Sequence, residues 1–225
     1  MHDEVAILIP CFNEELTIKD VVNDFKKHVP DAKVYVYNNN STDKTAQIAK
    51  DAGAIVVDSP NQGKGNVVRH MFQSIDADKY VLVDGDSTYF AKDLPNMLSI
   101  FDAFNCDMVI GDRLSSSYFT ENTRMFHNPG NKLVRFLVNF LFHGSITDVM
   151  TGYRVCSKKM CKSMAIKSEG FEIETEMTIY ALKHKYKVES VPITYSDRPE
   201  GSESKLSTFK DGIRILKFIA KECFL

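Results

Sequence analysis

Residues 80–86 read Tyr-Val-Leu-Val-Asp-Gly-Asp, a short apolar run that ends directly in two aspartates separated by one glycine. A continuous apolar run of this length is typical of a strand buried on both faces of a parallel sheet. Similar runs occur earlier, at Val5–Ile9, Val34–Tyr37 and Ala54–Val57, and segments with apolar residues at helical spacing separate them. The alternation predicts an α/β fold with a mostly parallel central sheet flanked by helices.

A polar cluster follows each of these predicted strands. The clusters are Pro10 to Glu14, Asn38 to Asp43, Asn61 to Gly65 and Asp84 to Asp86. Because the carboxyl ends of parallel strands meet at one edge of a sheet, where ligands bind in such folds, we expect a nucleotide site there. In the first cluster, we expect Asn13 to cap the following helix, whose apolar positions begin at Leu16.

Length and composition indicate an ordinary globular chain. The 225 residues are 44% hydrophobic and 26% charged, and we expect a single domain over 1–225. No apolar run approaches the roughly 18 residues that a membrane-spanning helix needs, and the N-terminus lacks the features of a signal peptide. We therefore expect a cytoplasmic protein. The five cysteines form no C-x-x-C pair, so neither a disulfide framework nor a zinc site is indicated.

The small net charge of −2 conceals two unlike halves. Residues 1–112 carry 10 Lys and Arg against 18 Asp and Glu, whereas residues 113–225 carry 18 against 12. Such a split is often no more than a solvated surface. The uneven distribution of charge also suits a chain whose first half binds a cation and whose second half binds anions.

The pair Asp84 and Asp86 offers two hard oxygen ligands at a fixed place on the predicted edge, with Gly85 leaving room between them. Such ligands suit Mg²⁺ or Mn²⁺, completed by water and a substrate diphosphate. With Thr88, the stretch also spells the D-x-D-x-T of phosphatases whose first aspartate attacks phosphate, so that class stays open. Dinucleotide-binding, P-loop and serine-hydrolase signatures are absent from the sequence.

Taken together, the motifs resemble the inverting family 2 glycosyltransferases with the GT-A (Rossmann-like) fold, and within them the branch that acts on polyprenyl phosphates. The resemblance extends from Val5 to about Leu206. It rests on eight motifs in the family's order, namely Ile9-Pro-Cys-Phe-Asn-Glu14, Asn38-Asn-Asn-Ser-Thr-Asp43, Asn61-Gln-Gly-Lys-Gly65, Asp84-Gly-Asp86, Gly111-Asp-Arg113, Asp148-Val-Met-Thr-Gly-Tyr-Arg154, Gly170-Phe-Glu-Ile-Glu174, and Tyr195-Ser-Asp-Arg198 leading to Ser204-Lys-Leu206.

The resemblance implies which residues meet the donor. Asp84 and Asp86 would hold Mg²⁺ or Mn²⁺ against the diphosphate, and Glu174 would face the sugar. The residues that would border the nucleotide are Pro10, Asn13, Glu14, Asn39, Lys64 and Asp84. Asn39 stands where many relatives have an aspartate that meets the base, and an asparagine can still donate and accept hydrogen bonds.

It also implies a set of acceptor residues in the second half. A lipid phosphate brings negative charge next to a diphosphate, so basic side chains must offset the repulsion. The residues implied are Arg113, Arg124, Asn128, Arg154, Arg198 and Lys205, with Arg113, Arg124 and Asp148 as the catalytic group. A phosphate acceptor is largely ionised at neutral pH and hardly needs a base, so Asp148 is a positioning group about as readily as a proton acceptor.

The implied function is transfer of a sugar, glucose or N-acetylglucosamine, from a UDP-sugar to a polyprenyl phosphate such as undecaprenyl phosphate, for cell-envelope glycan synthesis. Residues 1–112 would bind nucleotide and metal and residues 113–205 the acceptor. Residues 206–225 form a basic amphipathic helix that suits either a membrane surface or packing on the core. Residues 134–142 are a second candidate for lipid contact.

The remaining expectations concern location and partners. We expect a peripheral protein at the cytoplasmic face of the membrane, which reaches its lipid by surface contact or through a membrane partner protein. A homo-oligomer is compatible with the sequence, and a nucleic-acid partner is not expected. The alternatives are a family 2 transferase with a saccharide or protein acceptor, the D-x-D-x-T phosphatase, and a nucleotide-binding protein without catalysis.

Overall fold

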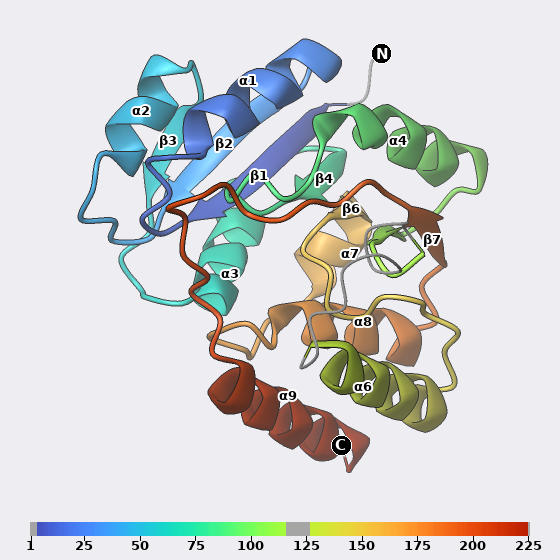
Figure 1. Ribbon diagram of the computed structural model, residues 1–225. Helices are drawn as coiled ribbons and strands as arrows, with labels where there is room; N and C mark the ends of the chain where they lie inside the picture. Colours follow the sequence, from blue (N-terminus) through green and yellow to red (C-terminus); the bar gives the residue numbers. More distant parts are fainter. Residues whose placement is uncertain (1–3, 116–126, 225) are drawn as a thin grey trace.

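The computed structural model describes residues 4–115 and 127–224 and shows a sheet covered by helices on both faces (Figure 1). The elements of the first half are β1 (Val5–Cys11), α1 (Ile18–His28), β2 (Lys33–Asn38), α2 (Thr45–Asp51), β3 (Ile55–Asp58), α3 (Lys64–Ser74), β4 (Lys79–Leu82), η1 (Ala91–Asp93), α4 (Leu94–Ala103) and β5 (Met108–Asp112). Those of the second half are α6 (His127–Phe142), β6 (Arg154–Ser157), α7 (Lys158–Ser163), α8 (Ile173–Lys183), β7 (Val188–Pro192) and α9 (Thr208–Cys223).

The strands of the described segments form one seven-stranded sheet in the order β3-β2-β1-β4-β6-β5-β7. The first four pair in parallel, as their continuous apolar runs predict, with Ile7 opposite both Val34 and Val81. β6 lies antiparallel between β4 and β5, and β7 is parallel to β5. The predicted α/β fold with a mostly parallel central sheet is therefore confirmed.

Alternate residues of β1 point to opposite faces of the sheet and fill two separate cores. Ala6 and Leu8 pack with side chains of α3, α7 and α8 on one face. Ile7 and Ile9 pack with side chains of α1 and α4 on the other. Because both faces are covered, the polar groups of the strands reach solvent mainly at the strand ends.

The start of α1 differs from the sequence-based expectation. The helix begins at Ile18, and its buried positions are Ile18, Val21, Val22 and Phe25. Asn13 lies before it with a φ of 53°, and its Oδ1 accepts a hydrogen bond from the Thr42 N–H at 2.8 Å. The prediction that Asn13 caps this helix is wrong, and Leu16 is 60% exposed rather than inward. The side chain of Asn13 instead ties the turn after β1 to the loop after β2.

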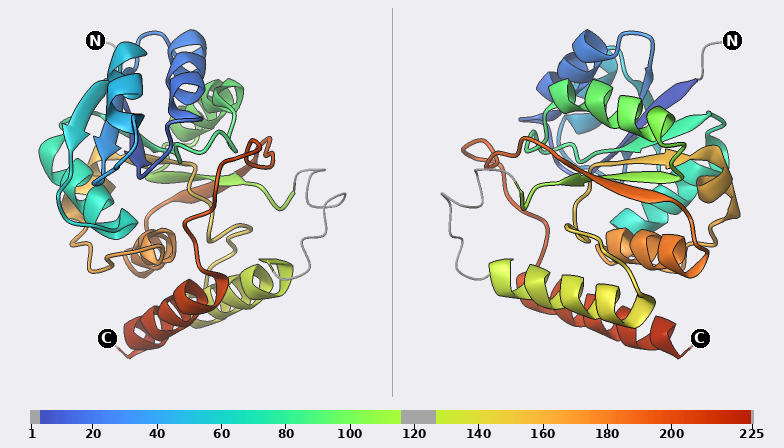
Figure 2. Two further views of the ribbon diagram at one scale, coloured as in Figure 1. Left: turned by 60° about the vertical axis from the view of Figure 1, so that its left-hand side comes forward. Right: turned by 90° about the vertical axis from the view of Figure 1, so that its right-hand side faces the viewer.

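Helices α6 and α9 lie side by side in an outer layer, with α8 between them and the sheet (Figures 1 and 2). Val134 and Val138 of α6, and Ile215 and Ile219 of α9, complete the core. None of the helices in the described part of the chain is both long and apolar enough to cross a membrane.

Glu222 anchors the end of α9 to the body of the protein. Its carboxylate lies 2.8 Å from Lys167 Nζ and 3.2 Å from Lys183 Nζ. The residue is buried, with 8% of its surface exposed. Burial raises the pKa of Glu222, but the hydrogen bonds from Lys167 and Lys183 outweigh that effect and leave the pKa below its ordinary value. The ionised form is therefore the one that the folded state favours.

This shift predicts how Glu222→Gln responds to pH. A carboxyl with a lowered pKa in the folded state stabilises the protein at neutral pH and loses that effect as the pH falls through its folded pKa. We expect Glu222→Gln to lower the free energy of unfolding by up to about 1 kcal/mol near neutral pH, and this difference to be smaller at about pH 3, below the ordinary pKa of a glutamate. Urea unfolding at both pH values measures this, with the exposed Glu200→Gln as control. A Glu222→Gln effect that grows on acidification would contradict the assignment.

Candidate active site

A pocket of about 500 Å³ opens at the carboxyl ends of β1 and β4, at the edge of the sheet where the sequence places its polar clusters. Pro10 lines it from the end of β1 and Glu14 from the turn that follows, Lys64 from the start of α3, and Asp84 and Asp86 from the loop after β4. The second half of the chain closes the pocket. Its lining residues include Arg113, Asn131, Phe171, Glu174, Tyr195, Arg198 and Lys205.

The loop that carries Asp84 and Asp86 is held tightly against β1. A Cβ atom at Gly85 would lie 2.7 Å from Cys11 Sγ, so the close approach requires a glycine. Thr17 Oγ1 donates a hydrogen bond to the Gly85 carbonyl at 2.6 Å. Thr88 donates to Asp86 Oδ1 from its backbone N–H at 3.1 Å and from its hydroxyl at 2.7 Å. Thr88 thus fixes the orientation of Asp86.

Lys64 joins Asp84 to Glu174. Its Nζ lies 2.5 Å from Asp84 Oδ1 and 2.5 Å from Glu174 Oε1. Burial lowers the pKa of Lys64, but the charges of Asp84 and Glu174 outweigh this and raise it well above its ordinary value. The predicted donor residues Lys64, Asp84 and Glu174 are therefore brought into direct contact with one another.

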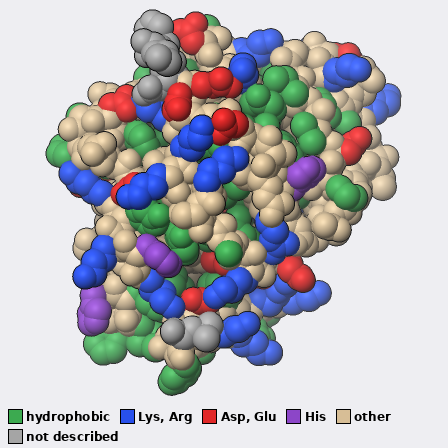
Figure 3. Space-filling model, turned by 180° about the vertical axis from the view of Figure 1, so that it is seen from behind, with side chains coloured by type: hydrophobic (Ala, Val, Ile, Leu, Met, Phe, Trp, Pro, Cys, Tyr) green, Lys and Arg blue, Asp and Glu red, His purple; other side chains and the backbone are tan. Residues whose placement is uncertain are grey.

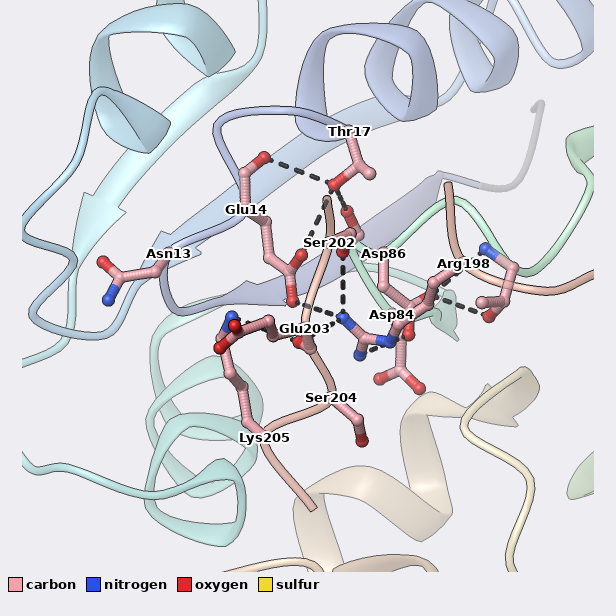
Figure 4. Close-up of polar contacts among 12 residues, drawn as sticks. Asn13, Glu14, Thr17, Asp84, Asp86, Arg198, Ser202, Glu203, Ser204 and Lys205 are labelled. Carbon is pink, nitrogen blue, oxygen red and sulfur yellow. Dashed lines mark hydrogen bonds and ion pairs between the residues drawn. The ribbon is translucent and has the colours of Figure 1, made fainter. Parts of the chain in front are cut away.

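Arg198 joins the other two carboxylates of the pocket, and Figure 4 shows its side chain reaching toward both. Its Nη2 lies 2.6 Å from Asp86 Oδ2, and its Nη1 lies 3.2 Å from Glu14 Oε1. Nη1 also donates to the carbonyl of Glu203 at 2.9 Å, which links Arg198 to the segment that contains Lys205. The chain between β7 and α9 consequently crosses the mouth of the pocket.

At this edge of the sheet, two basic side chains, Lys64 and Arg198, contact four carboxylates. These are Glu14, Asp84, Asp86 and Glu174. Burial and the charge of Asp84 raise the pKa of Asp86 even though Arg198 is adjacent. Burial likewise raises the pKa of Glu14 despite the same arginine. Excess negative charge and hard oxygen donors fit a divalent cation held by Asp84 and Asp86. Within residues 4–115 and 127–224, no group of three or more His, Cys, Asp or Glu side chains is arranged to hold a metal, so the remaining ligands would come from substrate and water.

Arg113 and Asp148 form a two-point ion pair beside the pocket. Arg113 Nε lies 2.8 Å from Asp148 Oδ2, and Nη2 lies 3.1 Å from Oδ1. Asp148 is 1% exposed, and the Arg113 guanidinium also lies 5.3 Å from the centre of the Tyr195 ring. Because both oxygens of Asp148 face Arg113, the geometry suits a carboxylate that orients the arginine more than one that accepts a proton from a substrate.

Asn39 is buried, and its amide holds the loop after β2 to the loop at residues 59–63. Its Nδ2 donates to the carbonyls of Ser59 and Asn61, both at 2.8 Å, while its Oδ1 accepts from the Gly63 N–H at 2.8 Å. Both N–H bonds are used within the protein. The side chain lines the pocket, as predicted, but a bound base can meet it only as an acceptor.

Two predicted site residues, Asn13 and Arg154, differ from the structure, and for Arg124 and Asn128 the prediction falls outside what the structure describes. Asn13 does not line the pocket, since its side chain is directed to Thr42. Arg154 is fully buried, so the predicted contact with an acceptor does not fit its position. Arg124 lies outside the described residues, as does the side chain of Asn128. Pro10, Arg198 and Lys205 line the pocket as expected.

Two aromatic residues of the pocket carried no predicted role. Tyr195 packs on Tyr89 with ring centres 5.2 Å apart and lies next to Arg113. Phe171 lies 6.0 Å from Lys64 Nζ. Both residues belong to motifs quoted in the sequence analysis. Tyr195 also comes shortly after strand β7, as the polar clusters come after the earlier strands, and this position is the signal that could have identified it.

The family model described as "Glycosyl transferase family 2" matches residues 6–164. The chain is 37% identical over 211 residues to "Glycosyltransferase AglJ" of Haloferax volcanii, a match that covers 93% of this chain and 69% of the relative. It is 29% identical over 221 residues to "Dolichyl-phosphate hexose transferase" of the same organism, covering 98% of this chain and 94% of the relative.

The fold is also found among solved structures. Glucosyl-3-phosphoglycerate synthase from Mycobacterium tuberculosis, in complex with Mn²⁺, uridine diphosphate and glucosyl-3-phosphoglycerate, superposes with a TM-score of 0.79 at 17% identity. The match covers 99% of this chain and 81% of that one.

The role of Asn39 in the loops predicts the effect of Asn39→Ala. The substitution leaves the buried Ser59 carbonyl and the partly buried groups of Asn61 and Gly63 without their partner, and we expect a loss of about 1–3 kcal/mol in the free energy of unfolding. Asn40→Ala is the matched control, because Asn40 is the exposed neighbour that donates to the Pro60 carbonyl at 2.9 Å. Urea unfolding measures both variants. Equal effects at the two positions would show that Asn39 has no special part in holding the loops.

Proposed function

The chain belongs to glycosyl transferase family 2, and we propose that it moves a sugar from a nucleotide diphosphate donor to a polyprenyl phosphate, with inversion, at a membrane surface. Family membership makes it a glycosyltransferase, which supports a role of Asp84-Gly-Asp86 in that chemistry rather than in phosphatase chemistry. The observation that carries the proposal is the pocket itself. It brings an acidic, metal-compatible loop together with the paired Arg113 and with the basic residues Arg198 and Lys205, of which Arg198 contacts Asp86 directly.

The donor is a nucleotide whose base presents an N–H group to Asn39. Since both N–H bonds of the Asn39 amide are used by Ser59 and Asn61, its remaining capacity is a lone pair on Oδ1. Uracil and guanine both carry a ring N–H that such an acceptor can bind. Among these, a UDP-sugar is favoured by the structural neighbour solved with uridine diphosphate. Glucose or N-acetylglucosamine is the proposed sugar, with Glu174 facing it.

Asp84 and Asp86 would hold Mg²⁺ or Mn²⁺. The cation would neutralise negative charge on the nucleotide diphosphate, which leaves when the bond between the sugar and the diphosphate breaks. Lys64 and Arg198 are already in place beside these carboxylates, so each can turn from its carboxylate to a phosphate oxygen when the donor binds.

The acceptor phosphate binds at the basic side of the pocket, where Arg113 is held rigid by Asp148. A phosphate monoester needs no base at neutral pH, since it is already ionised. The role of Asp148 is therefore to orient Arg113 and to reduce its conformational freedom before the acceptor arrives. The relative named as a dolichyl-phosphate hexose transferase supports a lipid phosphate as acceptor.

The outer helices supply the proposed contact with the bilayer at its cytoplasmic face. Phe136 and Phe140 of α6 are 62% and 67% exposed and stack with ring centres 5.8 Å apart. Phe209 and Ile213 of α9 are also exposed. Basic side chains accompany them, namely Lys132, Lys210, Lys217 and Lys221. Figure 3 shows Lys and Arg side chains around exposed hydrophobic ones at this end of the molecule. Aromatic side chains with a basic rim suit an anionic membrane surface.

Transfer activity tests the proposed function. The protein is incubated with Mn²⁺, undecaprenyl phosphate and each of a panel of radiolabelled UDP- and GDP-sugars, and label in the organic phase is counted. We expect label with a UDP-sugar, and a loss of about 10²-fold or more for Asp86→Asn, since the cation and the diphosphate lose a ligand. Asp51→Asn, an exposed carboxylate on α2, should match the wild type. Absence of label in the organic phase with every donor would refute the lipid acceptor.

The membrane surface is tested by vesicle binding. We expect the double variant Phe136→Ser, Phe140→Ser to weaken sedimentation with phosphatidylglycerol vesicles by about tenfold or more, since two aromatic side chains no longer leave water. Phe104→Ser is the matched control, because Phe104 is 51% exposed beyond the end of α4 and lies next to Lys187. Equal weakening by both variants would mean that α6 does not face the bilayer.

A further inference from the structure

Arg154 is a fully buried arginine at the start of β6, and it does not reach the pocket mouth. Burial lowers its pKa, and the nearby charges of Glu174 and Asp148 act in the opposite direction. None of the ion pairs found in the described part of the chain includes it. A buried guanidinium is costly unless its donors are used, so its hydrogen bonds indicate why it is there.

The three nitrogens of Arg154 bind three oxygen acceptors, and Nη1 also lies 3.5 Å from Met108 Sδ of β5. Nε donates to the carbonyl of Thr151 at 3.0 Å, and Nη2 donates to the carbonyl of Val149 at 2.6 Å. Nη1 donates to Thr178 Oγ1 at 2.9 Å, and that hydroxyl donates in turn to the carbonyl of Glu174 at 3.0 Å. The guanidinium therefore connects the turn at residues 148–152 to helix α8.

The turn at residues 148–152 contacts both Arg113, on the proposed acceptor side of the pocket, and Asp84, on the proposed donor side. At one end, Asp148 holds Arg113. At the other end, Gly152 packs so closely on Asp84 that a Cβ atom would lie 2.5 Å from Asp84 Oδ2. The Gly152 N–H also donates to the hydroxyl of Tyr89 at 3.0 Å. A displacement of the turn would change the separation between Arg113 and Asp84.

We propose that Arg154 is a positioning residue, which fixes the turn at residues 148–152 so that Arg113 stays at a set distance from Asp84 and Asp86, and that Thr178 is its anchor on α8. The inference rests on the proposed function, in which Arg113 meets the acceptor phosphate. Lysine could not replace it, because one ammonium group lacks the planar set of donors that spans Thr151, Val149 and Thr178.

Helix α8 offers a matched pair of substitutions. Thr178 and Thr175 are both fully buried, but Thr175 Oγ1 has no hydrogen-bond partner within the described residues. Thr178→Val removes the anchor of Arg154 and keeps the shape of the side chain, whereas Thr175→Val removes a hydroxyl that binds nothing in that part of the chain. Arg154→Lys is a second, stronger test of the same connection.

The first measurement is kinetic. We expect Thr178→Val to lower kcat or raise KM for the lipid phosphate by about tenfold, because Arg113 is misplaced, while the Kd for UDP with Mn²⁺ stays within about twofold. Thr175→Val should match the wild type, and Arg154→Lys should show a larger defect than Thr178→Val. Equal kinetics for Thr178→Val and Thr175→Val, or an equal loss of donor binding and acceptor use, would overturn the proposal.

The second measurement does not depend on transfer. Hydrogen exchange followed by mass spectrometry reports on the amides of Met150 and Gly152, which donate to Asp148 Oδ1 and to Tyr89. We expect faster exchange across residues 149–152 in Thr178→Val and Arg154→Lys, with unchanged exchange in β1. Unchanged exchange in the turn would overturn the connection even if the wild type transfers sugar. If the wild type transfers none but the turn exchanges faster, the proposed function fails and the connection stands.

Discussion

The balance of charge at the carboxyl ends of β1 and β4 is the constraint on which the site depends. Glu14, the pair Asp84 and Asp86, and Glu174 come from three separate parts of the chain and meet around one pocket. Without counter-charges their mutual repulsion and burial would be unfavourable. Lys64 and Arg198 supply those charges from inside the protein. In the proposed function, a divalent cation replaces these basic groups at the carboxylates, and the diphosphate of the donor replaces the carboxylates at Lys64 and Arg198. The charges of the site are therefore balanced both before and after the donor binds.

The charge asymmetry of the sequence has a structural counterpart. The acidic first half provides the loop of Asp84 and Asp86, and the basic second half provides Arg113, Arg198 and Lys205, which line the same pocket. The second half also covers the first, since β6 inserts between β4 and β5 and the segment after β7 crosses the pocket. The two halves therefore share one sheet, and both contribute to the lining of this pocket.

Local patterns predict the first four strands, because a short continuous apolar run has few alternatives to a buried strand. They also predict the edge where the polar residues meet, since parallel strands end on the same side. They do not show which arginine faces the pocket. Arg113 and Arg154 both follow from the same resemblance, but Arg154 stands on β6, whose antiparallel insertion turns it into the core. The pairing of Arg113 with Asp148 likewise depends on contacts between residues far apart in sequence. Asn13 failed as a cap because its side chain binds a loop from the next strand.

In the proposed function, Asp84 and Asp86 hold a divalent cation together with the diphosphate of the donor. Calorimetric titration of Mn²⁺ into the protein, with and without saturating UDP, tests this most directly. Because Lys64 and Arg198 occupy the carboxylates until phosphate oxygens draw them away, UDP should strengthen Mn²⁺ binding by about tenfold or more. Mn²⁺ that binds equally well without UDP, or that fails to bind in its presence, would contradict the account.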